Sequence, residues 1–427
     1  MNRFVYSLLL YLILPFVPLK LLWRGIKQPE YRANWAQRFG FYAVKVTKPV
    51  IWLHCVSVGE TRAAEPLIKA LLQQYPRHQI LLTHGTPTGR DASEALFGNA
   101  IFNNPVQRVY LPYDLPFAVK GFLTHFKPTI GLILETELWF NLIAACKQRD
   151  IPLLLLNARL SERSAKGYAK LGGLIGEGLQ NLSAIAAQTA DDAARLQALG
   201  AHNISVAGNL KFDVKPPTDA IDKGLQLRQL LGENRPIFLA ASTREGEEAL
   251  ILEAVKDLDV LTIIVPRHPQ RFDAVEAIIQ NAGFAYQRRS HLNKQIDKSV
   301  QVVLGDSMGE LFTYYAACDF TLVGGSLLPF GGQNLIEAAA MGKPILIGSH
   351  TFNFAEASNN ALAMQAAIRV KNVAELRAQI AFLTQNIAKR EVMQQAAMQF
   401  SQTATGATAR LMPLIATYIN KTKAVQL

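Results

Sequence analysis

Cysteine is scarce in this sequence of 427 residues. Its three cysteines, Cys55, Cys146 and Cys318, are far apart and lie in apolar surroundings. Such a sparse and odd set argues against a disulfide framework and against a cysteine zinc site, and it fits a reducing compartment. The eight histidines show no H-x-x-x-H spacing and no His/Cys cluster. We therefore expect no metal site and no bound cofactor.

Two common nucleotide-binding motifs are also missing. No G-x-x-x-x-G-K-[ST] segment occurs, which excludes a P-loop site. The first expected strand leads into Val58-Gly59-Glu60 rather than into G-x-G-x-x-G, and this disfavours dinucleotide binding. The composition, 50% hydrophobic and 18% charged, is typical of a packed globular protein.

The first 50 residues combine an apolar run with most of the excess positive charge. They carry eight Lys/Arg and one acid, Glu30, which is +7 of the net charge of +11. The apolar run over residues 4–19 is shorter than the roughly 20 residues of a comfortable bilayer span, and Pro15 and Pro18 interrupt it. No small-residue cleavage pattern follows, so a cleaved signal peptide is disfavoured.

Three interpretations of residues 1–24 stay open: an anchor lying on an anionic inner leaflet, a single uncleaved span, and a buried N-terminal helix. We favour the first, because Trp23 and the basic residues suit the headgroup region, where each cation contributes about 1 kcal/mol. Either membrane arrangement puts the body of the protein on the cytoplasmic side of the inner membrane. Positive charge beside an apolar segment indicates anionic membrane lipids, and not nucleic acid, as a partner.

From residue 50 onward, short apolar runs alternate with amphipathic segments, which predicts an α/β fold with parallel sheets covered on both faces. The polar, proline-containing segment 213–219 interrupts this alternation and reads as a linker. We therefore expect a membrane-anchor segment (1–24), an N-terminal Rossmann-like domain (25–212) and a C-terminal one (220–427). The last helix either completes the C-terminal domain or returns to the N-terminal one. The expected strands are residues 50–58, 79–83, 108–111, 130–134, 152–156, 184–187 and 204–207 in the first domain, and 236–241, 260–265, 301–304, 321–323, 344–347 and 367–370 in the second.

Ligands of doubly wound sheets bind beyond the carboxyl ends of the strands, so we expect a cleft between the domains and chemistry where strands end. In the first domain, Glu60 is either a first-turn charge that stabilises a helix or a base that accepts a proton from a sugar hydroxyl. Glu135 and Glu137 follow an apolar strand and either cap a helix or serve the chemistry. Lys211 is either a solvated lysine or a cation that meets a phosphate.

In the second domain, Arg267 ends a strand and could bind a phosphate or carboxylate through its planar donors. Residues 305–310 follow another strand and open a helix, where backbone N–H groups favour an anion. Glycine pairs at 324–325 and 331–332 flank the turn before a helix that contains Glu337. This arrangement suits a nucleotide, with phosphate at the helix start and ribose hydroxyls on the carboxylate.

Seven segments together resemble one family. They are Ser57-Val-Gly-Glu60, Tyr113-Asp-Leu-Pro116, Glu135-Thr-Glu-Leu-Trp139, Asn157-Ala-Arg-Leu-Ser161, Leu210-Lys-Phe-Asp213, Pro266-Arg-His-Pro269 and Gly331-Gly-Gln-Asn334. In this order, over most of the chain, they resemble the bacterial 3-deoxy-D-manno-octulosonic acid (Kdo) transferases that act on lipid IVA. One departure is Phe140, which stands where the family pattern leads us to expect proline, and it puts only the local backbone shape in doubt.

The resemblance implies a GT-B fold and transfer of Kdo from CMP-Kdo to lipid IVA, with inversion and without a metal. It implies that Glu60 is the general base and that Glu135 and Lys211 support the transition state. It also implies that CMP is bound by Pro266, Arg267, Met308, Gly309, Glu310, Asn334, Leu335, Ile336 and Glu337. Two alternatives stay open on the same scaffold. One is a nucleotide-sugar epimerase, which would need no membrane anchor, and the other is a non-catalytic nucleotide-sugar binding protein.

Overall fold

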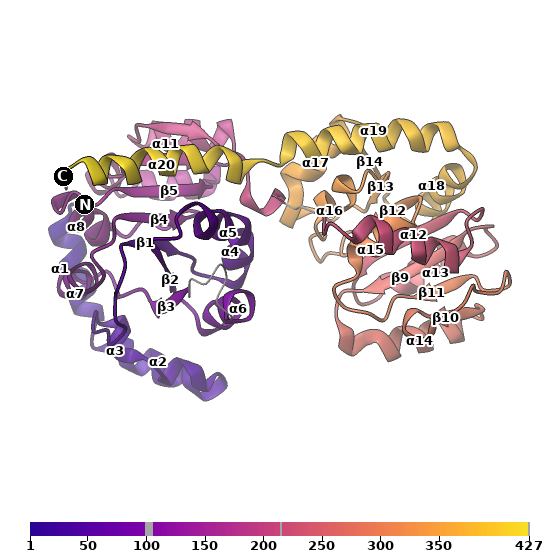
Figure 1. Ribbon diagram of the computed structural model, residues 1–427, viewed down its shortest axis with the longest axis horizontal. Coiled ribbons are helices and arrows are strands. Elements are labelled where there is room, and N and C mark those ends of the chain that lie inside the picture. The colour runs from indigo at the N-terminus through magenta and orange to yellow at the C-terminus, as the bar shows by residue number, and fades with distance from the viewer. Residues whose placement is uncertain (99–105, 214–215, 426–427) are drawn as a thin grey trace. The chain divides into compact units, whose positions relative to one another are not determined.

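The computed structural model describes residues 1–98, 106–213 and 216–425, and it divides into two compact units (Figure 1). The first unit is formed by Met1–Asp213 together with Thr405–Leu427, and the second by Val214–Ala404. Each unit is built on a seven-stranded sheet whose paired strands are all parallel. Residues 214–215 of the expected linker lie outside the described residues.

The sheet of the first unit has the order β3-β2-β1-β4-β5-β6-β7. Alternate residues of the buried central strands enter two different apolar cores, with Trp52 in one and Ile51 in the other, as expected for a sheet covered on both faces. The strands are β1 (Val50–His54), β2 (Gln79–His84), β3 (Gln107–Tyr110), β4 (Ile130–Leu134), β5 (Leu153–Ala158), β6 (Ala184–Ala187) and β7 (Ile204–Val206). The covering helices are α4 (Val58–Ala63), α5 (Glu65–Gln74), α6 (Pro87–Phe97), α7 (Pro116–Phe126), α8 (Phe140–Gln148), α9 (Glu162–Ala169), α10 (Gly173–Gln180) and α11 (Ala190–Ala198).

The last helix, α20 (Ala407–Val425), belongs to the first unit. Its buried residues Ala407, Leu411, Ile415 and Ile419 repeat every four positions and join the core that contains Ile51. Asp213 fixes the start of this helix, because its carboxylate accepts hydrogen bonds from the backbone N–H groups of residues 406–408.

The sheet of the second unit has the order β10-β11-β9-β8-β12-β13-β14. Its strands are β8 (Ile237–Thr243), β9 (Leu261–Pro266), β10 (Tyr286–Arg288), β11 (Val302–Leu304), β12 (Phe320–Val323), β13 (Ile345–Ile347) and β14 (Ala367–Arg369). Its α-helices are α12 (Ala220–Leu231), α13 (Glu247–Val255), α14 (Phe272–Asn281), α15 (Leu311–Ala317), α16 (Leu335–Ala340), α17 (Ala355–Ala363), α18 (Val373–Gln385) and α19 (Ile387–Ala404). Among the described strands, the edge strand β10 is the one that the sequence did not predict, since its three residues are half-buried and two of them are polar.

The N-terminal apolar segment forms two helices, α1 (Arg3–Ile13) and α2 (Phe16–Lys27), with a bend of 55° at the break before Phe16. Neither helix alone is long and apolar enough to cross a membrane, whereas the bent pair together has the length and composition of a membrane span. No residue of α1 is buried, and in α2 only Leu21 and Gly25 are. The alternative of a buried N-terminal helix is therefore wrong.

One polar network ties α1 to the body of the first unit. The buried carboxylate of Asp114 accepts hydrogen bonds from the Tyr6 hydroxyl (3.0 Å) and from the first backbone N–H groups of α8, those of Asn141 and Leu142. Phe140 begins α8 and packs its ring edge-on against Tyr6, 5.2 Å between centroids. Proline, which the family pattern led us to expect at residue 140, is favoured at the first position of a helix. With phenylalanine at this position α8 still begins at residue 140, and the ring adds the contact with Tyr6.

Candidate active site

Glu60 lies in the first turn of α4, directly after β1, and only 8% of its surface is exposed. Its carboxylate accepts hydrogen bonds from the backbone N–H of Val56 (2.7 Å) and from the Ser57 hydroxyl (2.9 Å). In return, Ser57 Oγ accepts from the Glu60 N–H and caps the helix. α4 begins at Val58, so Glu60 is an acid in the first turn of a helix, as one of its two interpretations from the sequence has it.

Glu135 and Lys211 meet in the first unit, although 76 positions separate them in the sequence. Lys211 Nζ donates to Glu135 Oε1 at 3.0 Å, and both side chains are partly exposed, by 39% and 28%. The Lys211 segment Leu210–Phe212 is held by Asn157, whose side chain accepts from the Leu210 N–H at 2.9 Å. Lys211 is therefore an ion-paired cation and not a freely solvated lysine.

A group of carboxylates forms around this ion pair. Burial raises the pKa of Glu60, the nearby Glu135 carboxylate raises it further, and Lys211 lowers it. Burial, together with the Glu60 and Glu135 charges, raises the pKa of Glu137 to about 7. The same edge of the sheet thus gathers Glu60, Glu135, Glu137 and Lys211, which is the arrangement expected of a general base with supporting charges.

Backbone strain marks the ends of the same strands. Glu135, straight after β4, has φ +59°, and Asn157, at the irregularity in β5, has φ +52°. Asparagine adopts this left-handed region readily, whereas a glutamate there is uncommon, so the conformation of Glu135 is the one that points to strain at a functional site. In the second unit Ser242 adopts φ +58° at a similar irregularity near the end of β8.

In the second unit, Asn334, Glu337 and Arg267 come together as the sequence predicts. Asn334 caps α16 by accepting from the Ile336 N–H, and its amide donates to Glu337 Oε1 at 3.2 Å. Arg267 follows β9 and donates through Nε to Gln333 Oε1 at 3.3 Å. Burial raises the pKa of Glu337, while Asn334 and Arg267 oppose that shift. Leu335 and Ile336, the first two residues of α16, are buried.

The segment Met308–Glu310 follows β11, which pairs with the Arg267 strand β9. The Met308 side chain is exposed, and Gly309 adopts φ +80°. Glu310 accepts from the Ser307 hydroxyl (2.6 Å) and from Arg289 (3.1 Å), and it lies directly before α15. Pro266 is the last residue of β9, and because β9 and β11 are paired in parallel, Arg267 and this segment lie at the same end of the sheet.

Glu247, at the start of α13, organises the loop that contains the glycine pair 324–325, which we call the glycine loop. The sequence did not single out this residue. It is fully buried, and its carboxylate accepts from three backbone N–H groups, those of Arg244 (2.9 Å), Gly325 (2.6 Å) and Leu327 (2.9 Å). An acid at a helix start reads as an ordinary first-turn charge in a sequence, so only the folded loop reveals this role.

Replacing Glu247 by glutamine is expected to destabilise the second unit by about 3 kcal/mol. The new amide group must point an N–H₂ at one of the three backbone N–H donors, so a buried donor loses its acceptor. Denaturant unfolding of the full chain would measure the effect, and CMP affinity would fall with it. Glu253→Gln, in the exposed part of the same helix, is the matched control and should leave both unchanged. Equal stability of the two variants would contradict this role.

The part of the chain that the structure describes holds no group of three or more His, Cys, Asp or Glu side chains arranged to bind a metal ion.

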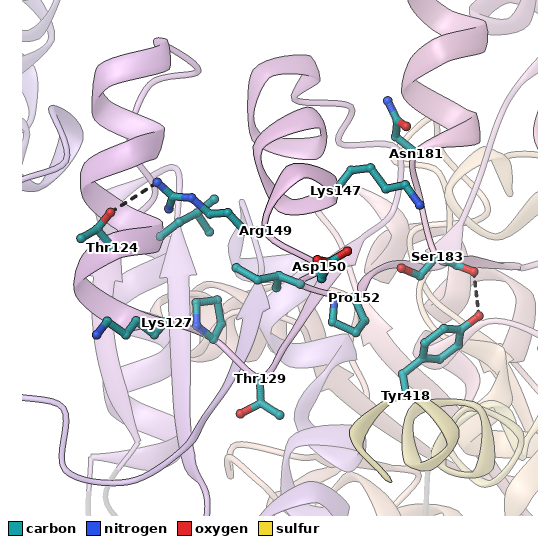
Figure 2. A pocket seen from close by; sticks show the side chains of 13 residues that line it. Thr124, Lys127, Thr129, Lys147, Arg149, Asp150, Pro152, Asn181, Ser183 and Tyr418 are labelled. Carbon is teal, nitrogen blue, oxygen red and sulfur yellow. Dashed lines mark hydrogen bonds between the residues drawn. The ribbon is translucent and has the colours of Figure 1, made fainter. Parts of the chain in front are cut away.

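A cavity of about 690 Å³ lies at the opposite edge of the first sheet, among residues that precede β4 and β5 (Figure 2). Figure 2 shows Arg149 directed at Thr124 and the Tyr418 hydroxyl at Ser183. None of the predicted site residues lines this cavity.

Comparison with known proteins decides the family. Residues 33–214 match the family model described as 3-deoxy-D-manno-octulosonic-acid transferase (kdotransferase). A 3-deoxy-D-manno-octulosonic acid transferase of Bordetella pertussis is 40% identical, and the match covers 96% of this chain and 98% of that protein. The chain belongs to the Kdo transferase family. The Kdo transferase of the same description from Haemophilus influenzae is 36% identical, covering 99% of this chain and 100% of that one.

As a Kdo transferase family member, the protein is a glycosyltransferase. A solved glycosyltransferase from Rickettsia africae ESF-5 has the same fold, with a TM-score of 0.56 over 88% of this chain and 100% of that chain. At 16% identity this likeness concerns the fold alone. It agrees with the expectation of two parallel-sheet α/β domains of the GT-B type.

Proposed function

We propose that this Kdo transferase moves Kdo from CMP-Kdo to lipid IVA, with inversion at the anomeric carbon and without a metal ion. The observation that carries the proposal is the grouping of Glu60, Glu135 and Lys211 at strand ends, in a chain with Kdo transferase relatives along its whole length. In this proposal the acceptor binds the first unit and the donor binds the second.

Glu60 acts as the general base. Its carboxylate takes the proton of the acceptor hydroxyl, the acceptor oxygen forms a bond to the anomeric carbon of Kdo, and the bond from that carbon to the CMP phosphate oxygen breaks. The raised pKa of Glu60 makes the carboxylate a stronger proton acceptor than an ordinary glutamate. Glu135 and Lys211 stay as an ion pair beside it and stabilise the charge that develops as the proton moves.

The donor is held by the residues around α16 and β9. Arg267 has donors suited to the CMP phosphate or the Kdo carboxylate, and Glu337 suits the ribose hydroxyls. The turn at Met308–Glu310 and the capped start of α16 offer backbone N–H groups to the phosphate. These donors supply the stabilisation of the leaving group that a metal would otherwise provide.

The direct test is the mass of the product formed from CMP-Kdo and lipid IVA by the purified protein. Addition of one or more Kdo units, with release of CMP and with chelator present, would support the proposal. A CMP-sugar that is altered without transfer would favour the epimerase alternative, and binding without any turnover would favour the binding-protein alternative. Either result would overturn the proposal.

We also propose that α1 and α2 attach the protein to the cytoplasmic face of the inner membrane. Both helices expose large apolar side chains beside basic ones, with Phe4 exposed by 77%, Phe16 by 65% and Trp23 by 68%. Exposed aromatic and apolar side chains with Lys and Arg nearby are typical of segments that lie in the interface of an anionic membrane.

Replacing Phe4, Leu12, Phe16 and Trp23 together by serine is expected to lower the affinity of the protein for inner-membrane vesicles at least tenfold. These exposed side chains carry the apolar area that would enter the lipid. Sedimentation with vesicles measures the release. Soluble CMP binding should be unchanged. The control, Ile221→Ser with Leu225→Ser, removes equally exposed apolar residues from α12 and should still sediment. Sedimentation of the first variant at the original level would reject this anchor.

A further inference from the structure

Arginine and tyrosine side chains alternate in a stack on the first unit. The Arg24 guanidinium lies 5.3 Å from the Tyr31 ring centroid, and the Arg38 guanidinium lies 6.0 Å from the same ring. Arg38 also lies 4.0 Å from the Tyr110 ring, which Arg90 approaches to 5.4 Å. We name this series, Arg24–Tyr31–Arg38–Tyr110–Arg90, the arginine ladder. Its members come from α2, η1 (Pro29–Arg32), α3 (Trp35–Arg38), β3 and α6.

The three arginines of the ladder form no ion pair within the part of the chain that the structure describes. Among residues 1–98, 106–213 and 216–425, no carboxylate lies within 4.0 Å of the guanidinium groups of Arg24, Arg38 or Arg90. Arg38 is only 5% exposed, and two of its nitrogens, Nε and Nη2, have no hydrogen-bond acceptor in that part of the chain. One nitrogen of Arg90 is likewise buried without an acceptor. Cation–π contacts offset part of the repulsion, but neighbouring like charges with so few acceptors favour an anion.

The ladder reaches the neighbourhood of Glu60. Arg38 Nη1 donates to the backbone oxygen of Gly85 at 3.2 Å, and the adjacent Thr86 donates to the Val56 oxygen at 3.1 Å. Val56 in turn donates its N–H to Glu60. Thr86 also caps the start of α6, so the helix dipole adds positive potential beside Arg90.

The other end of the ladder lies in the apolar N-terminal segment. Arg24 is exposed in α2 and donates to the Tyr31 hydroxyl at 3.5 Å. Its neighbours Trp23 and Ile26 are exposed by 68% and 71%. A molecule that binds along the ladder therefore meets exposed apolar side chains at one end and approaches Glu60 at the other. This pattern matches a lipid with a phosphorylated sugar headgroup better than it matches a soluble anion.

We propose that the arginine ladder binds a phosphate group of the lipid acceptor and so positions the acceptor hydroxyl at Glu60. This inference rests on the proposed function for the identity of the acceptor. The exposed Arg24 and the half-buried Arg90 supply the donors for the phosphate, and the buried charge of Arg38 raises the positive potential between them. The ladder is a binding and positioning element, and it takes no part in the proton transfer.

The test compares Arg90→Gln and Arg24→Gln with the wild-type protein on two acceptors, lipid IVA and lipid IVA stripped of its phosphates, both in neutral detergent micelles. With lipid IVA, each variant should raise the acceptor KM about tenfold or more, with kcat within about twofold and the KM for CMP-Kdo unchanged. With the dephosphorylated acceptor, wild type and variants should have the same KM. Arg90→Lys should recover part of the loss.

The control, Arg77→Gln, removes an exposed arginine in the loop before β2 and should leave every constant unchanged. A KM increase that persists with the dephosphorylated acceptor would overturn the ladder proposal, as would an increase that appears only on vesicles of anionic phospholipid, which would assign the ladder to bulk lipid. Binding of lipid IVA without CMP-Kdo provides a readout independent of turnover. If the wild type binds lipid IVA more tightly than Arg90→Gln yet transfers nothing, the proposed function fails while the ladder proposal stands.

Discussion

Glu60→Gln is expected to lower kcat by about 10²- to 10⁴-fold, the usual contribution of a general base, while CMP binding stays at the wild-type level. Glutamine has nearly the shape of glutamate. Its amide oxygen can accept from the Val56 N–H, and its amide N–H₂ can donate to the Ser57 hydroxyl, so the start of α4 should persist. The change therefore removes proton acceptance and little else. Single-turnover transfer and calorimetric titration with CMP are the two measurements.

Ser57→Ala separates the two roles of this position. It removes the cap of α4 and one hydrogen bond to Glu60, but it keeps the carboxylate. We expect a loss of stability of about 1 kcal/mol and a kcat within tenfold of wild type. If Glu60→Gln transferred Kdo at the wild-type rate, or if Ser57→Ala lost as much activity as Glu60→Gln, the capping role alone would explain Glu60.

The alternation of apolar runs was sufficient to predict both sheets, because their central strands, such as β1, β4 and β9, are buried on both faces and consist mostly of apolar residues. The limits of β4 and β6 agree with the prediction residue by residue. β1 ends at His54 and not at residue 58, because the Ser57 side chain caps a helix there. The hydrogen bonding of the Ser57 side chain thus sets the end of β1, which the pattern of apolar residues alone could not predict.

Contacts between distant parts of the chain were beyond the reach of the sequence pattern. Strand ends predicted that Glu60, Glu135 and Lys211 lie at one edge, but the ion pair between Glu135 and Lys211 depends on how Asn157 holds the segment before Lys211. Glu247 looked like any first-turn acid, and its three backbone partners appear only when the glycine loop folds over it. The side chains of the arginine ladder come from five secondary-structure elements, so no local sequence motif predicts their contacts.

Lys211→Met is expected to lower kcat/KM by about 10²- to 10³-fold, comparable to the loss of one preorganised donor at a developing charge. It should also change the pH profile. The Lys211 charge lowers the pKa of Glu60, so its removal raises that pKa. A base with a higher pKa takes up its proton at higher pH, and the fall of kcat/KM on the acid side should begin at higher pH than in the wild type. Because the Glu60 carboxylate acts on the pKa of Glu137, the profile reports this pair and not one residue.

Two comparisons show whether this effect comes from the ion pair. Lys69→Met removes the same charge from an exposed i,i+4 pair with Glu65 on α5, and it should change neither the rate nor the profile. Lys211→Arg keeps a cation beside Glu135, so its acid limb should stay near the wild-type position even if the rate falls. A reduced rate with an unshifted acid limb in Lys211→Met would mean that Lys211 contacts substrate without influencing Glu60. An unchanged rate would remove Lys211 from the site, and Glu60 and Glu135 would then have to support the reaction without that cation.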